Sequence, residues 1–360
     1  MANTKIPSEL IADGSIVTAK IADDAVSADK LASSAVVTAS IVDDAITSAK
    51  IVDNPTFSGT ESITIPSGTT AQRASSPANG MVRYNTTEST VEGYISGQWR
   101  ELQTAGYAYT LEYVVVEGGG AGGTGAYSDA AGGAGGGGYR SSVSGESSGR
   151  GASAEAAMTV NPTTVYTITV GAGGSNAVGG NSLISGSGLT TITSNGGGEG
   201  GDRQGSNNKD GGCGGGGGYL YPAAGSGTTG QGYDGGLFAS SYYPAAGGGG
   251  AGGTATGSVN EVGGAGVATS VTGSAVTYAL GGHGGNSTNG ASPVAGGANT
   301  GTGGGGYYGS GGNGANGGSG IVILKVPTAS YSGTTTGSPT VTTVGDYKII
   351  KFTSSGTYTG

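Results

Sequence analysis

Four short motifs carry residue types that could do chemistry. GESSG at 145–149 has the G-x-S-x-G form of a nucleophile elbow, in which a serine attacks a carbonyl with help from a histidine. GSGTTG at 225–230 has the G-x-G-x-x-G form that binds a dinucleotide pyrophosphate. GGEGGD at 197–202 matches the start of a calcium-binding nonapeptide. His283, the single histidine, could ligate a metal where three copies meet on an axis.

Each motif lacks a part that its chemistry needs. A nucleophile elbow needs a strand before it, a helix after it and a histidine partner. Dinucleotide binding needs a βαβ context and a downstream acid, and calcium nonapeptides work as tandem copies. Glycan cleavage would need paired carboxylates, and acidic residues are sparse around these motifs. For His283 we favour a packing or solvent-facing role. We therefore predict no enzyme activity, no catalytic or metal site and no cofactor.

Aromatic residues in glycine-rich loops are the stronger candidates for a binding site. YLYPAAGSG (219–227) and SYYPAAGGG (241–249) share the string YPAAG. A tyrosine on a rigidly held loop offers an apolar face to a sugar ring or a protein and keeps its hydroxyl for hydrogen bonds. The alternative is that the rings cover bare glycine backbone or a subunit interface. The candidate binding residues are Tyr219, Tyr221, Tyr233, Phe238, Tyr242, Tyr243, Tyr307 and Tyr308.

Glycine marks the region that must position these loops. The sequence has 83 glycines, of which 71 lie between Gly118 and Gly320. Glycine runs alternate with strand-like segments such as YTLEYVVVEG, TTVYTITVGAGG and GGSGIVILKV. Alternating apolar residues predict half-buried strands, and continuous apolar residues predict fully buried ones. We therefore predict a glycine-rich head domain at 107–326.

Glycine runs can form a scaffold of their own. Without a Cβ, a run can adopt the three-residue-per-turn polyglycine II helix, which has no internal hydrogen bonds and must pair laterally with its neighbours. Disorder is the alternative for a chain this rich in glycine. Disordered chains are usually charged and poor in aromatics, whereas only 10% of this sequence is charged and 19 residues are tyrosine. We therefore predict packed polyglycine II-like segments between the strands.

The N-terminal region is repetitive. Residues 11–50 are four tandem decapeptides, IADGSIVTAK, IADDAVSADK, LASSAVVTAS and IVDDAITSAK, in which a large aliphatic residue recurs every five positions. This spacing fits neither one face of an α-helix nor one face of a flat strand. Three chains wound around one axis would bury the row, so we predict a homotrimeric stalk at 11–54. A monomeric solenoid and a disordered linker are weaker alternatives.

Two smaller β regions complete the predicted organisation. Residues 55–106 are expected to form a β neck with a turn at Asn79-Gly80 and a hairpin at Ser96-Gly97. Its small apolar face is predicted from Val82, Tyr84, Val91, Tyr94, Trp99 and Leu102. Trp99 is interpreted as a core or trimer-axis residue. Residues 327–360 are predicted as a C-terminal β segment that either closes the head or forms a separate unit.

Charge and terminal sequence exclude several classes of protein. A net charge of -9 and a pI near 4.5 argue against nucleic-acid binding, which needs clustered Lys and Arg. Cys213 is the single cysteine, so no intrachain disulfide is expected. The start, MANTKIPSEL, lacks the apolar region of a signal peptide, and the sequence has no run of 18 apolar residues. We expect synthesis in a reducing cytoplasm and no membrane insertion.

Two parts of the sequence resemble known proteins. The decapeptides with ITIPSGTTAQRASSPANGMVRYNTTESTVEGYISGQWREL resemble the shaft and neck of tail-fibre proteins of tailed bacteriophages. Residues 112–118 and 316–324 resemble the opening and closing strands of the glycine-rich domains and adhesins at the ends of such fibres. FTSSGTYT at the C-terminus resembles the strand that commonly opens such a domain.

The resemblance implies a virion protein that is mostly β and fibrous. Residues 1–10 would attach a homotrimer to other tail or baseplate proteins, and the head loops would bind a host surface glycan or outer-membrane protein. A purely structural fibre or spacer without a receptor site is the alternative. An ice-binding or cell-wall glycine-rich protein would show strict G-x-x tripeptides, which the irregular loops do not follow.

Overall fold

A computed structural model describes residue 62 and residues 64–102, 108–125, 129–202, 209–238, 244–256, 261–286 and 293–360. They belong to two compact units, one ending at Glu101 and the other beginning at Leu102. We call the described part of the first unit the neck and the second unit the head, and describe each by itself. The mostly β prediction is confirmed, and the helices of the described ranges are three-residue 3-10 turns. The attachment segment (1–10) and the stalk (11–54) lie outside the described residues, so the trimeric stalk stays a prediction.

The neck is a four-stranded sheet in the order β1-β2-β3-β4. Its strands are β1 (Ser67–Gly68), β2 (Val82–Asn85), β3 (Thr90–Ile95) and β4 (Gln98–Glu101), and η6 (Thr70–Gln72) follows β1. Both predicted turns are confirmed. Gly80 has a φ of 95° just before β2, and Ser96 and Gly97 have φ values of 53° and 79° between β3 and β4. Two consecutive positive φ values are typical of the two-residue hairpin turn.

The prediction of one apolar face for the neck is wrong. Cross-strand pairs share a face of a sheet, and Tyr84 pairs with Val91 whereas Tyr94 pairs with Trp99. Alternation along β3 places these two pairs on opposite faces. The face with Trp99 also carries buried Arg83, Asn85 and Glu92. The face with Tyr84 stays exposed, so the apolar residues of the neck are divided between the two faces.

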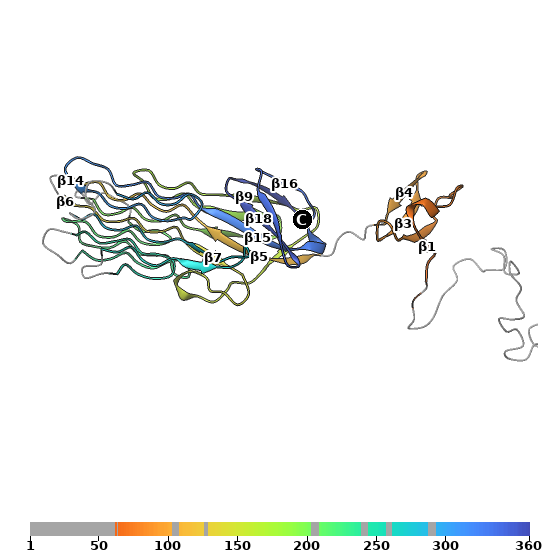
Figure 1. Cartoon of the computed structure of the whole chain (residues 1–360), viewed down its shortest axis with the longest axis horizontal. Coiled ribbons are helices and arrows are strands. Elements are labelled where there is room, and N and C mark those ends of the chain that lie inside the picture. The colour runs from red at the N-terminus through yellow and green to blue at the C-terminus, as the bar shows by residue number, and fades with distance from the viewer. Residues whose placement is uncertain are drawn as a thin grey trace, which may run out of the picture. The chain divides into compact units, whose positions relative to one another are not determined.

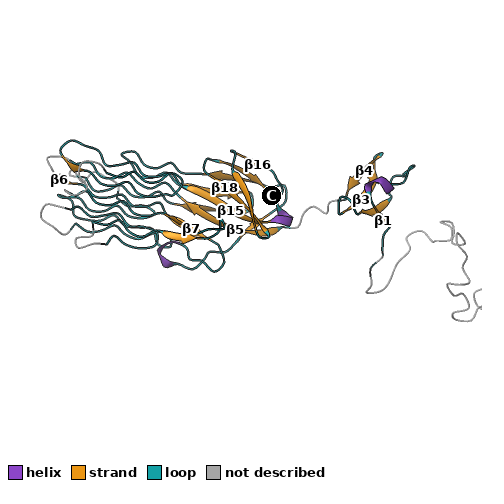
Figure 2. Cartoon of the chain, in the orientation of Figure 1, coloured by secondary structure: helices purple, strands orange, loops and turns teal. Residues whose placement is uncertain are grey.

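Two sheets form one end of the head (Figures 1 and 2). A six-stranded sheet has the order β17-β18-β15-β5-β7, with β8 paired to the start of β5, and a five-stranded sheet has the order β11-β10-β9-β19-β16. The strands of the first are β5 (Tyr109–Val116), β7 (Tyr139–Ser141), β8 (Met158–Val160), β15 (Ile321–Pro327), β17 (Thr340–Val344) and β18 (Tyr347–Phe352). Those of the second are β9 (Val165–Thr169), β10 (Ser182–Gly186), β11 (Leu189–Ser194), β16 (Thr335–Thr336) and β19 (Gly356–Thr359).

The smaller elements of the head lie outside these sheets. A hairpin joins β12 (Val267–Thr269) to β13 (Val276–Tyr278), and β6 (Asp129–Ala130) pairs with β14 (Tyr308–Gly309). The 3-10 turns are η7 (Gly149–Gly151) and η8 (Thr328–Ser330). In Figure 1, β6 and β14 are at the end of the head away from the two sheets.

The central strands β5 and β15 of the six-stranded sheet are buried on both faces. Val115 belongs to an apolar cluster with Ile168 of the five-stranded sheet, whereas Val114 and Val116 belong to a second cluster with Tyr278 of β13. The predictions from apolar periodicity are thereby confirmed. The continuous runs of β5 and β15 pack on two sides, and the alternating VYTIT of β9 buries every second residue.

The C-terminal segment shares the sheets of the head. β18 pairs with β15, and β19 lies between β9 and β16. The GTYT of FTSSGTYT is β19, and buried Tyr358 donates to or accepts from the hydroxyl of Tyr109 at 2.5 Å. Residues from the two ends of the head therefore close one core.

Beyond the sheets, the head consists of extended glycine-rich segments that lie side by side (Figure 2). Each segment bonds to its neighbours with a period of three residues, as polyglycine II requires. The segment 118–123, which continues β5, donates to three neighbours in turn. The bonds run from Gly118 and Ala121 to Gly180 and Ala177, from Gly119 and Gly122 to Gly318 and Ala315, and from Gly120 and Gly123 to Gly135 and Gly132.

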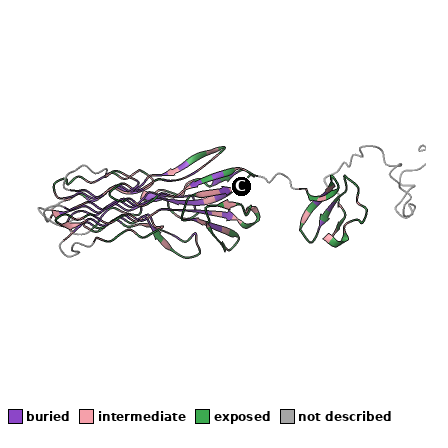
Figure 3. Ribbon diagram, turned by 90° about the horizontal axis from the view of Figure 1, so that it is seen from above, coloured by how far each residue is buried: buried purple, intermediate pink, exposed green. Residues whose placement is uncertain are grey.

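The central segment, 131–138, has neighbours on six sides, which is hexagonal packing. The six segments bonded to its backbone are 120–123, 195–201, 213–219, 246–249, 282–285 and 301–307. Figure 3 shows this interior as buried. Bare backbone is essential here, since a Cβ added to Gly135 would lie 2.0 Å from the carbonyl oxygen of Cys213. The glycine segments thus pack within one chain, and backbone replaces side chains as the core.

Candidate functional site

The head has a loop-bearing end opposite its chain ends. Tyr109 bonds to Tyr358, and the Gly360 N–H donates to the carbonyl of Thr164, so the first described strand of the head and its C-terminus meet at the sheets. The glycine segments lead from there to β6 and β14 at the other end (Figure 1). We call this other end the loop tip. Loops on a rigid frame are where binding residues concentrate, so the tip is the first place to look for a site.

Some of the predicted aromatic residues come together at the tip. The Tyr219 N–H donates to the carbonyl of Ala130 in β6, and the Tyr219 and Phe238 rings meet edge to face at 6.1 Å. Tyr221 is 44% exposed, and its backbone closes a tight turn with Gly218. The Phe238 N–H donates to the carbonyl of Pro222, which ties the two loop ends together.

Two leucines that the sequence interpretation missed extend this group. Leu220 is 48% exposed and Leu237 is 61% exposed. We define the tip patch as Tyr219, Leu220, Tyr221, Leu237 and Phe238. An exposed cluster of large apolar side chains is typical of interaction sites. The signal was present in the sequence as leucines inside glycine-rich loops, where no strand could bury them.

Tyr307 has a packing role instead. A Cβ added to Gly312 would lie 2.1 Å from the Tyr307 ring, and one added to Gly125 would lie 2.6 Å from it. The ring therefore covers bare backbone, as in the alternative interpretation of the aromatic residues. Tyr308 is half-buried in β14. These two tyrosines are at the tip and help to build it.

Tyr233 lies near the sheets, apart from the tip patch. Its ring lies 5.5 Å from the guanidinium of Arg150, which pairs with Asp234 at 3.0 Å. The hydrogen bond from Arg150 holds the pKa of Asp234 below its ordinary value. This cluster fixes the path of the loop before it returns to the tip. Tyr242 and Tyr243 lie outside the described residues.

In the described residues, GESSG lacks the long helix that follows a nucleophile elbow. Ser147 of GESSG is exposed and followed by η7, a three-residue turn. Burial raises the pKa of the Cys213 thiol, which disfavours the reactive thiolate. Burial likewise raises the pKa of Glu117, which lies fully buried where β5 meets the first glycine segment. In the described ranges, no three His, Cys, Asp or Glu side chains come close enough to hold a metal.

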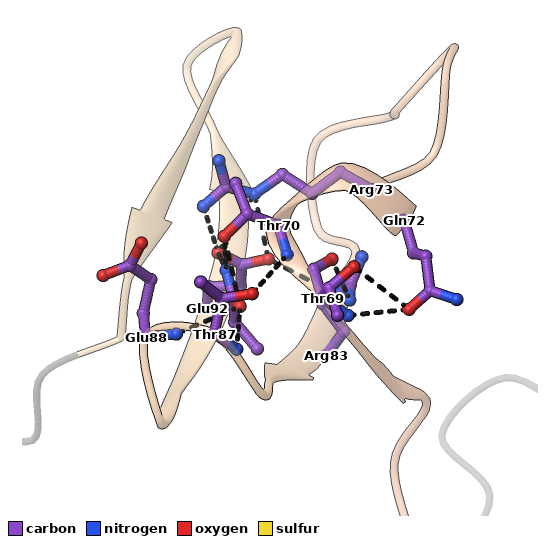
Figure 4. A network of polar contacts seen from close by, with 9 residues as sticks. Thr69, Thr70, Gln72, Arg73, Arg83, Thr87, Glu88 and Glu92 are labelled. Carbon is purple, nitrogen blue, oxygen red and sulfur yellow. Dashed lines mark hydrogen bonds and ion pairs between the residues drawn. The ribbon is translucent and has the colours of Figure 1, made fainter.

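The neck contains a buried charge network (Figure 4). Glu92 is 2% exposed and accepts hydrogen bonds from Arg73 Nε at 3.1 Å and Asn85 Nδ2 at 3.0 Å, with Arg83 Nε at 3.5 Å. The hydrogen bonds from Arg73 and Asn85 and the charge of Arg83 hold the pKa of Glu92 below its ordinary value. The Trp99 ring has Arg73 at 5.9 Å and Arg83 at 6.0 Å. The half-buried Trp99 ring therefore packs against this network.

The opposite face of the neck sheet is an uncovered apolar surface. Its side chains are Val82 (43% exposed), Tyr84 (38%), Val91 (38%) and Ile95 (43%). We call these four residues the open neck face. The sequence interpretation placed Val82, Tyr84 and Val91 on the same face as Trp99, and it did not show that η6 and Arg73 would cover the face with Trp99.

Along the described residues, no helix is both long enough and apolar enough to cross a membrane.

Comparison with known proteins identifies the larger unit. No curated protein and no solved structure matches the chain. The model of one family, described as a glycine-rich domain, matches residues 96–327. This match spans more than half of the sequence and runs from the end of the neck to the end of β15, so the chain belongs to the glycine-rich domain family.

Proposed function

We propose that this chain is a non-enzymatic subunit of a trimeric tail fibre of a bacteriophage, and that the loop tip of its head binds a receptor on the host surface. The observation that carries the proposal is the tip patch. Its exposed side chains lie at the end of the head opposite Tyr109 and Gly360, on loops held by a backbone-bonded frame. That arrangement suits a domain that presents a surface away from its point of attachment.

The chemistry of the patch favours a host surface glycan or an outer-membrane protein as the receptor. Tyr221 offers an exposed apolar ring and a hydroxyl for hydrogen bonds, and the half-buried rings of Tyr219 and Phe238 pack edge to face. Such rings stack on sugars or pack into apolar protein surfaces at low entropic cost. The leucines add apolar area that water disfavours.

The open neck face supports the trimeric part of the proposal. The described neck is near the size below which a domain usually needs disulfides, metals or oligomerisation to fold. Its apolar side chains Val82, Tyr84, Val91 and Ile95 are not covered by the described residues of the neck. Two further copies around an axis would cover them. The proposed attachment to other tail or baseplate proteins through residues 1–10 completes the virion role.

The trimer is tested by the mass of the native protein. We expect light scattering of the purified full chain to give three times the single-chain mass of 34.0 kDa. The physical reason is that pentad-spaced aliphatics in the predicted stalk and the open neck face both gain burial from association. A native mass equal to one chain at micromolar concentration would contradict the trimer and leave receptor binding to be judged separately.

The receptor site is tested by adsorption to bacteria. Purified full chain is screened against a panel of intact strains, and the double variant Tyr221→Ala, Leu237→Ser is then compared on each strain bound. We expect adsorption to weaken roughly 30-fold or more, because truncating exposed anchors of an interface typically costs at least about 2 kcal/mol.

Tyr347→Ala is the matched control, since Tyr347 is 38% exposed but lies on β18 in the sheets. Equal adsorption of the double variant and the wild type would refute the tip as the receptor site. Adsorption to no strain would favour a structural fibre or spacer. Shortened surface polysaccharide after incubation would point to an enzyme.

A further inference from the structure

A groove on the side of the head has no role in the proposed function. It has a volume of about 450 Å³ and is lined by three extended segments, 280–284, 293–295 and 302–306. This volume is within the range of ligand-binding pockets. His283 is its one ionisable lining residue among those described.

The hydrogen bonds of the segment 279–285 leave one row of donors unused. Gly281 and Gly284 donate to the segment 261–264, and Gly282 and Gly285 donate to Ala134 and Ala131. The remaining donors of this three-residue period are the N–H groups of Leu280 and His283. Across the described parts of the chain, neither of these two N–H groups has a hydrogen-bond acceptor.

The segment 303–306 leaves one row of acceptors unused. Its N–H groups bond to Leu280, Gly120, Val294 and His283, and the carbonyls of Gly304 and Gly305 accept from Ala134 and Ala315. The carbonyls of Gly303 and Gly306 accept no hydrogen bond from any described residue. These two carbonyls are again three residues apart.

Both unused rows border the same position of the hexagonal array. The segment 303–306 has five bonded neighbours, where the central segment 131–138 has six. Around 303–306, the missing sixth neighbour would lie between the segments 279–285 and 293–295. The groove is at this position. The free N–H groups of Leu280 and His283 point toward the position beside 303–306, which is the same position. With respect to the described residues, the groove is therefore an empty place for one more extended segment.

The groove walls fit a small extended chain. A Cβ added to Gly305 would lie 3.1 Å from its nearest neighbour, Val294 N, whereas one added to Gly304 would lie 1.9 Å from a carbonyl oxygen. The packing is thus looser at the groove than inside the array. Leu280 is 37% exposed and Val294 is 75% exposed, so they supply apolar contacts at its rim.

We propose that this groove binds an extended glycine-rich peptide segment of a partner protein in the polyproline II conformation. The peptide carbonyls accept from Leu280 and His283, and its N–H groups donate to Gly303 and Gly306. Peptides that add a strand to a sheet edge bind in a comparable way, because main-chain hydrogen bonds supply the affinity. A bulky peptide is excluded, because side chains that face the array meet bare backbone. The inference stands apart from the tip patch and from the trimer.

The test measures binding of a fluorescently labelled octapeptide of glycine with two serines, capped at both ends, to the full chain. We expect a saturable rise in anisotropy and slower hydrogen exchange in the peptide fragment that contains Leu280 and His283. An otherwise identical peptide built with N-methylglycine keeps an extended conformation but cannot donate. It is expected to bind about tenfold more weakly or worse, because two hydrogen bonds are lost.

Protein variants give the second half of the test. Val294→Trp should fill the groove and weaken binding about tenfold, a 1.4 kcal/mol effect on affinity. Val165→Trp on β9, where Val165 is 53% exposed, is the matched control and should bind like the wild type. The proposal is overturned if binding is absent at about 10 mM peptide, well above the roughly 1 mM constant of a weak complex. Binding that is insensitive to N-methylation or to Val294→Trp also overturns it.

Discussion

Replacing Gly135 with alanine is expected to prevent the head from folding. The new Cβ would lie 2.0 Å from the Cys213 carbonyl oxygen and 2.6 Å from the carbonyl carbon, and both are backbone atoms that no rotamer change can move. Relief requires a shift of whole segments, which breaks the bonds that Gly135 makes with Gly198 and Gly120. Overpacking plus unsatisfied buried backbone groups amounts to about 4–6 kcal/mol. That is comparable to the total stability of many domains.

Gly253→Ala is the matched control for this prediction. A Cβ there would meet its nearest atom, the Cβ of Ala265, at 3.6 Å, an ordinary contact. Because alanine also restricts the unfolded chain, the variant should be neutral or more stable by about 0.4–1 kcal/mol. Both variants are compared by denaturant unfolding and by yield of soluble protein. A Gly135→Ala head as stable as the wild type would show that the glycine segments are not packed as described.

Glu92→Gln is expected to destabilise the neck strongly while leaving the head intact. The substitution keeps the shape of the side chain but removes its charge, so Arg83, whose side chain is 9% exposed, loses its buried counter-charge. Removing one partner of a buried ion pair costs about 3–5 kcal/mol, which is large for so small a domain. Trp99 is the single tryptophan of the sequence and lies against this network, so its fluorescence reports on the neck alone.

Arg100→Gln supplies the control, because Arg100 also lies in the neck sheet but is exposed on the face opposite Glu92. It should leave the Trp99 emission and its thermal transition unchanged. A Glu92→Gln protein with the wild-type Trp99 transition would mean that the network does not stabilise the neck.

The same network predicts how the neck responds to acid. The pKa of Glu92 is below its ordinary value of 4.5 in the folded neck, chiefly through the hydrogen bond from Arg73. A lowered folded-state pKa stabilises the fold fully above the unfolded value and less as the pH falls through the folded value. The Trp99 transition should therefore shift to lower temperature below about pH 4.5, and this shift should be smaller in Glu92→Gln. An equal acid shift in both proteins would assign the effect to other groups.

Much of the strand structure could be predicted because it depends on local pattern. The continuous apolar runs of β5 and β15 and the alternation of β9 set their burial before any partner is known. Gly80 and the Ser96-Gly97 pair set their turns through backbone conformation. The neck faces were predicted less well, since alternation separates two faces without showing which one a loop will cover. Arg73, far from β3 in sequence, decides this by bonding to Glu92.

The candidate site was predicted only in part for a related reason. Tyr219 and Tyr233 lie in similar glycine-rich surroundings, yet one is in the tip patch and the other lies beside Arg150 near the sheets. Their places depend on how far each lies along its glycine segment and on which segment pairs with it. All glycine segments present the same backbone groups, so no side chain specifies which segments pair.

Three features of this protein could be predicted from its residues: it is mostly β, glycine-rich backbone forms its largest region, and aromatic loops interrupt that region. Those features follow from local periodicity and from the absence of Cβ atoms. The tertiary structure alone decided that the glycine segments pack hexagonally within one chain around 131–138, which aromatic residues reach the tip, and where one position of the array stays empty. The physical reason is that these outcomes depend on lateral bonds between segments distant in sequence, and identical backbone groups do not specify their partners until the whole head is assembled.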